Sequence, residues 1–153
     1  MKLAEALVLR ADCQRKVSQL KQRLERVVKV QEGEQPSEQP AVLLDELKRT
    51  LDELTAWIKK INKTNSFCSF NSNMSLSDAL AERDQLMQQR NLLNELLEAA
   101  SIKQDRYSRS EVKFYRTIDV VEVQKEVDEL SKKYREIDFK IQEKNWNTEL
   151  LED

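Results

Sequence analysis

The chain has 153 residues, a formal net charge of −2 and a hydrophobic content of 39%. This length fits one domain, and the apolar content suffices for a modest core. One glycine and two prolines are too few for the turns of a strand-rich protein, so a mainly helical fold is expected. The chain has no histidine and no phosphate-loop or nucleophile motif, which argues against most enzyme classes.

The termini and the cysteines indicate where the protein works. Charged residues interrupt the apolar N-terminal stretch early, at Glu5, Arg10 and Asp12, so we identify no signal peptide and no membrane span. Cys13 and Cys68 lie far apart without a C-x-x-C pattern and are interpreted as reduced thiols. We therefore expect a cytoplasmic protein with neither a membrane nor nucleic acid as its partner.

Apolar residues spaced alternately three and four apart predict four long helices, at about 2–30, 41–64, 77–103 and 119–151. The first ladder is Leu3, Ala6, Arg10, Cys13, Val17, Leu20, Leu24 and Val27. The second, which is the most regular, is Leu44, Leu47, Leu51, Leu54, Ile58 and Ile61. The third is Leu80, Arg83, Leu86 or Met87, Arg90, Leu93, Leu97 and Ala100. The fourth is Val120, Val123, Val127, Leu130, Tyr134, Ile137 and Ile141.

Two segments lose the helical period. Residues 67–76 contain an Asn/Ser turn between short apolar pieces, and residues 111–118 alternate as a strand does. We therefore predict a mainly α protein with one domain, 1–153. Its long antiparallel helices form a four-helix bundle or helical hairpins, and a small β element can form from about 67–76 and 111–118.

A polar segment, 104–111, lies between the third helix and the second of these β segments and is the clearest local candidate for a site. Its arginines could share an anion-binding cavity with two arginines that interrupt the third ladder. The candidate ligand-binding set is Arg83, Arg90, Asp105, Arg106, Tyr107, Arg109 and Glu111. The competing interpretation, which we weight more heavily, is that these groups make structural salt bridges, satisfy loop backbone groups or form a subunit contact.

Metal and cofactor chemistry has little support. Di-iron helical proteins need Glu-x-x-His, which a chain without histidine cannot supply. Carboxylate pairs such as Glu95 with Glu98 could hold magnesium, but a chain with 28 acidic residues produces such pairs by chance. We predict no metal, no cofactor and no catalytic residue, so an enzyme is disfavoured.

Several stretches together resemble a family, the small bacterial proteins labelled septicolysin. They are Met1–Leu7, Lys29–Glu34, Ile61–Asn65, Ala79–Asp84, Gln104–Phe114 and Asn145–Leu150. The similarity extends over nearly the whole chain and is weakest at Ser66–Ser75, where Asn71-Ser72-Asn73 replaces an expected glycine turn. The resemblance implies membership of a family without agreed catalytic residues. Its label implies a membrane-active protein, which narrow apolar ladders flanked by charge disfavour.

The four ladders present more apolar helix surface than packing within one short chain easily buries. The sequence therefore predicts a homo-oligomer that acts as a structural or protein-interaction module. The alternative is a protein that binds a small anion or a nucleotide through segment 104–111, with hydrolysis as one activity open to such a site.

Overall fold

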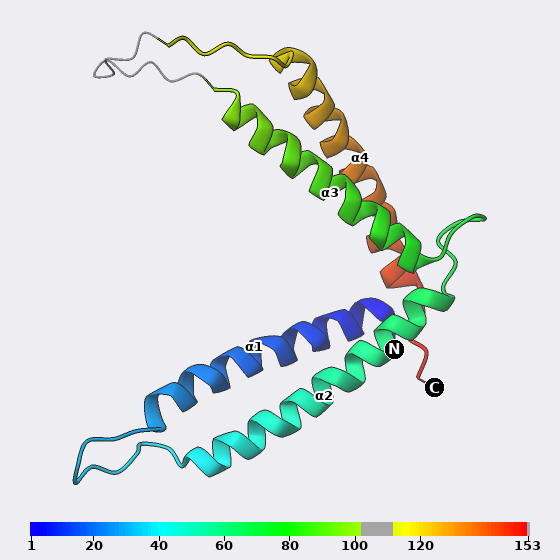
Figure 1. Ribbon diagram of the computed structural model, residues 1–153. Coiled ribbons are helices and arrows are strands. Elements are labelled where there is room, and N and C mark those ends of the chain that lie inside the picture. Colours follow the sequence, from blue (N-terminus) through cyan, green and yellow to red (C-terminus); the bar gives the residue numbers. More distant parts are fainter. Residues whose placement is uncertain (102–111, 153) are drawn as a thin grey trace. The chain divides into compact units, whose positions relative to one another are not determined.

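The computed structural model describes residues 1–101 and 112–152, and within them the chain is mainly helical (Figure 1). The helices are α1 (Leu3–Val27), α2 (Pro40–Phe67), α3 (Leu76–Ala99) and α4 (Val120–Asn147). Pro40 stands in the first turn of α2, where its missing N–H costs nothing. The four predicted helices are confirmed, with ends that shift by one to four residues.

The contacts of the chain divide it into two compact units, where the sequence predicted one domain. The first unit comprises Met1–Ser77 and Gln142–Asp153, and the second comprises Asp78–Ile141. Both α3 and α4 run from one unit into the other.

In the first unit, α1 packs along α2. Their shared core contains Leu20, Leu24, Val27 and Leu43, with Leu47 packed against it. The first ladder is confirmed, because six of its eight positions are buried: Leu3, Ala6, Cys13, Leu20, Leu24 and Val27. Burial raises the pKa of the Cys13 thiol, and the nearby Glu53 carboxylate of α2 raises it further.

Two ion pairs join α1 to α2 and to the segment just before it. Arg23 Nε donates to Glu38 Oε2 at 3.1 Å, just before α2 begins, and Lys16 Nζ lies 3.1 Å from Glu46 Oε1. The hydrogen bond from Arg23 holds the pKa of Glu38 below its usual value. As residue numbers fall from Arg23 to Lys16 along α1, the numbers of their partners rise.

The chain termini meet beside the end of α2. Leu3 N donates to Thr148 O at 2.9 Å, and Leu150 N donates to Met1 O at 2.8 Å. Glu149 pairs with Lys2 and with the terminal amine, and the Lys2 hydrogen bond holds its pKa below the usual value. These contacts explain why α4 ends at Asn147 and not at the predicted residue 151.

The second unit pairs α3 with α4 (Figure 1). The fourth ladder is largely confirmed, since Val127, Leu130 and Ile141 are buried and its other residues are half-buried. The apolar residues of the third ladder are half-buried throughout. The second unit therefore has a shallower core than the first.

The predicted small β element is absent from residues 1–101 and 112–152. Between α2 and α3 there is one isolated bridge, Ser69 with Ser75. The intervening turn closes on the Asn71 side chain, whose Oδ1 accepts the N–H groups of Asn73 and Met74 at 2.8 and 3.0 Å. Residues 112–118 form no strand, because alternation without a neighbouring strand leaves the backbone hydrogen bonds unmade. Glu111 lies outside the described residues.

Candidate functional site

The seven residues of the predicted site divide into two groups. Arg83 and Arg90 lie on α3, and both are half-buried. The other five lie outside the described residues: Asp105, Arg106, Tyr107, Arg109 and Glu111. Of the predicted set, the structure therefore describes Arg83 and Arg90.

Both arginines contact α4. Arg83 Nη1 donates to Asp138 Oδ1 at 2.7 Å, and the two side chains are 23% and 26% exposed. Two turns further along α3, the Arg90 guanidinium lies over the Tyr134 ring, 5.8 Å from its centroid. A groove beside them on α3 is lined, among its described residues, by two carboxylates and no basic side chain: Asp84, Met87, Gln88, Asn91, Leu92 and Glu95. This groove does not suit an anion.

Replacing Arg83 by alanine should therefore lower stability. We expect the free energy of unfolding, measured by urea denaturation, to fall by about 1 kcal/mol, because the lost ion pair is largely shielded from water. Arg49→Ala is a matched control, since its pair with Asp45 is 71% and 68% exposed and should contribute almost nothing. Unchanged stability, together with lost stabilisation by added phosphate, would favour the anion site instead.

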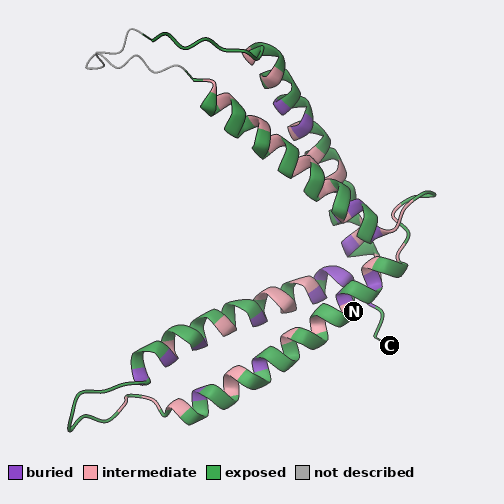
Figure 2. Ribbon diagram, viewed as in Figure 1, coloured by how far each residue is buried: buried purple, intermediate pink, exposed green. Residues whose placement is uncertain are grey.

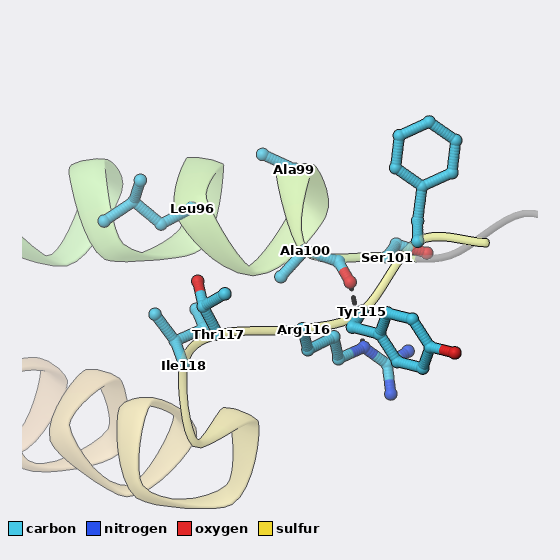
Figure 3. Close-up of a pocket in the computed structure, with 9 residues that line it drawn as sticks. Leu96, Ala99, Ala100, Ser101, Tyr115, Arg116, Thr117 and Ile118 are labelled. Carbon is cyan, nitrogen blue, oxygen red and sulfur yellow. Dashed lines mark hydrogen bonds between the residues drawn. The ribbon is translucent and has the colours of Figure 1, made fainter. Parts of the chain in front are cut away.

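A hollow of about 580 Å³ lies at the end of α3 (Figure 3). Its lining is mainly apolar and comprises Leu96, Ala99, Ala100, Ser101, Phe114, Tyr115, Arg116, Thr117 and Ile118. Arg116 Nε donates to the Ala100 carbonyl at 2.8 Å. The last carbonyls of a helix carry partial negative charge, so Arg116 acts as a cap for α3.

The most extended functional candidate is a face of α2. Leu44, Leu51 and Ile58 stand seven residues apart, and their side chains are 54%, 43% and 37% exposed. They belong to a row in which positions alternate three and four apart and all are exposed: Ala41, Leu44, Lys48, Leu51, Thr55, Ile58 and Asn62. We call this row the α2 seam. Figure 2 shows exposed positions, in green, along much of α2.

The seam is distinct from the face that packs on α1. That inner face carries the buried residues Leu43, Thr50, Ile61 and Thr64, with Leu47 and Leu54 half-buried. The second ladder predicted from the sequence therefore splits between two faces. Its members Leu47, Leu54 and Ile61 face inward, whereas Leu44, Leu51 and Ile58 remain exposed.

The ladder predicted from the sequence contains Leu44, Leu51 and Ile58 but does not separate them from the residues that face α1. The signal that separates them was present, because an apolar arc that includes Leu43, Leu44 and Leu47 is too wide for contact with one helix. Charged residues border the seam at Asp45, Asp52 and Lys59, all exposed. An exposed seam with a heptad repeat and a charged border has the pattern of a helix–helix contact.

In the part of the chain that the structure describes, no group of three or more Cys, Asp or Glu side chains is placed to hold a metal ion. No described helix combines the length and the apolar character needed to cross a membrane.

Comparisons with known proteins agree with this fold. A crystal structure of a functionally unknown conserved protein from Corynebacterium diphtheriae is 45% identical, and the match covers 99% of each chain with a TM-score of 0.87. No curated protein matches the chain. Residues 10–150 match a family described as a family of unknown function (DUF6847). The chain therefore belongs to this family.

Proposed function

We propose that this protein is a homo-oligomeric structural or protein-interaction module built from antiparallel helical hairpins. The observation that carries the proposal is the α2 seam, whose three large apolar side chains are 37% to 54% exposed at heptad spacing. Helices with such a repeat associate by inserting these side chains between those of a partner helix. The order of the α1–α2 ion pairs supports the antiparallel hairpin.

The energetics favour a modest affinity. Fully burying a leucine or isoleucine side chain contributes about 1.5–3 kcal/mol, so the half-exposed side chains of two copies could together contribute several kcal/mol. Association costs at least about 4 kcal/mol in lost translational and rotational freedom. Lys48, Thr55 and Asn62 also occupy core positions of the seam, where polar residues set alignment at the expense of stability. We expect a dissociation constant on the order of micromolar.

The test is the mass in solution. At concentrations well above about 1 µM, light scattering should give at least twice the chain mass of 18.0 kDa. The melting temperature should rise with protein concentration, because association stabilises the folded state by mass action. A mass of 18.0 kDa that persists at the highest soluble concentration would contradict the proposal.

A further inference from the structure

Charge is distributed unevenly along α2. Its first half contains four acidic residues, Asp45, Glu46, Asp52 and Glu53, against two basic ones, Lys48 and Arg49. After Glu53 the helix has no acidic residue and three lysines, Lys59, Lys60 and Lys63. The helix is therefore acidic toward its start and basic toward its end.

The same change from acidic to basic residues runs along one border of the seam. Asp45, Asp52 and Lys59 are spaced seven apart and all are exposed, so they form a single flanking row. Residues that flank a helix–helix seam meet the flanking residues of the partner helix, and their charges set its identity and direction. The row on α2 begins with a carboxylate and ends with an ammonium group.

We infer that the occupant of the α2 seam is the α2 seam of a second copy, packed in the opposite direction. In this arrangement, Asp45 of each copy lies beside Lys59 of the other, which gives two symmetric pairs per dimer. A parallel, in-register arrangement would instead place the two flanking rows on opposite sides of the dimer, so that Asp45 and Lys59 of different copies would not meet. The inference rests on the proposed homo-oligomer and adds its contact surface and its direction.

The alignment that joins Asp45 to Lys59 also suits the seam. It centres the contact near Asp52, because 45 and 59 lie equally far on either side of it. Leu51 of one copy then lies near Thr55 of the other, so each central leucine meets a small residue that leaves room for it. Asp52 meets its own copy at the twofold axis, and this is a like-charge contact that limits the affinity.

The test uses three charge-reversed variants, Asp45→Lys, Lys59→Asp and the double variant that carries both. Each single reversal places like charges together twice per dimer and should raise the dissociation constant about tenfold. The double variant restores opposite charges and should dimerise nearly as well as the parent chain. Circular dichroism of each variant checks that the helices are retained. Because Asp45 also pairs with Arg49 at 3.4 Å within α2, the Lys59→Asp variant gives the cleaner single reversal.

Mixing the parent chain with the double variant distinguishes the direction. If the helices are antiparallel, a mixed dimer brings like charges together, so native mass spectrometry should show mixed dimers well below the random proportion. A proportion above random would overturn the inference. A random proportion, which parallel packing or contact through another face of the chain would give, overturns it too.

Failure of this inference is distinguishable from failure of the proposed function. If the parent chain is monomeric, both fail. A second outcome is that the parent chain is oligomeric, but the double variant does not recover association and forms mixed dimers with the parent chain at the random proportion. In that case the proposed oligomer stands and only the α2–α2 contact is wrong.

Discussion

Leu20→Ala is expected to lower the free energy of unfolding by about 3 kcal/mol, because the lost side chain leaves a cavity in a packed core. Leu20 is 1% exposed and packs with Leu24, Val27 and Leu43 where α1 meets α2. The loss is a large fraction of the stability of a small helical protein. Urea denaturation monitored by circular dichroism measures it.

Leu44→Ala is the matched control, since the chemical change is identical and Leu44 is 54% exposed on α2. Below the dissociation constant, where the chain is monomeric, its effect should be about 0.5 kcal/mol or less. Equal losses in the two variants would mean that the inner and outer faces of α2 are packed alike, which would contradict the assignment of Leu44 to the seam. The measurement must therefore be made at low protein concentration.

The sequence pattern predicted helices well because helix formation follows local periodicity. For α1 and α4, every ladder residue is buried or half-buried. In both helices the ladder positions form one stripe that a neighbouring helix can cover, while Val8, Val121 and Phe139 lie outside it and are exposed. The α2 pattern contains two adjacent stripes, and periodicity alone does not state which one meets α1. That choice depends on tertiary contacts, such as the ion pair between Lys16 and Glu46.

The β prediction was wrong for a related reason. Alternation describes one strand, whereas a sheet requires a second segment at the correct distance and alignment. At 69–75 the Asn71 side chain satisfies the turn backbone, so one bridge suffices. At 112–118, Arg116 instead caps the C-terminus of α3. The Asn71 turn has a local signature, because asparagine favours such turns, whereas the contact between Arg116 and Ala100 depends on tertiary placement.

The candidate site was predicted only in part. Arg83 and Arg90 were correctly placed on one face of the third helix, but the sequence could not identify their partners on α4. Partners such as Asp138, which is far from Arg83 in sequence, depend on how two helices are aligned. The hypothesis that the arginines bind an anion stays a prediction, which the Arg83→Ala experiment tests.

Leu51→Glu is expected to convert the oligomer into a monomer. Leu51 is the central apolar residue of the α2 seam, and 43% of its side chain is exposed in the single chain, so a carboxylate there can remain hydrated. In the dimer, two carboxylates would be buried close together, at a cost of several kcal/mol. The dissociation constant should rise by at least about a hundredfold, and light scattering should give 18.0 kDa.

The control for this last variant is Val42→Glu, which places the same charge on the same helix. Val42 is 61% exposed but lies outside the seam, so the variant should keep the mass and the concentration-dependent melting of the parent chain. The two substitutions change net charge equally, and a difference between them therefore reports position and not charge. If both variants dissociate, charge on α2 disrupts association from any side; if neither does, the oligomer forms through another surface. Only dissociation by Leu51→Glu alone places the contact on the seam.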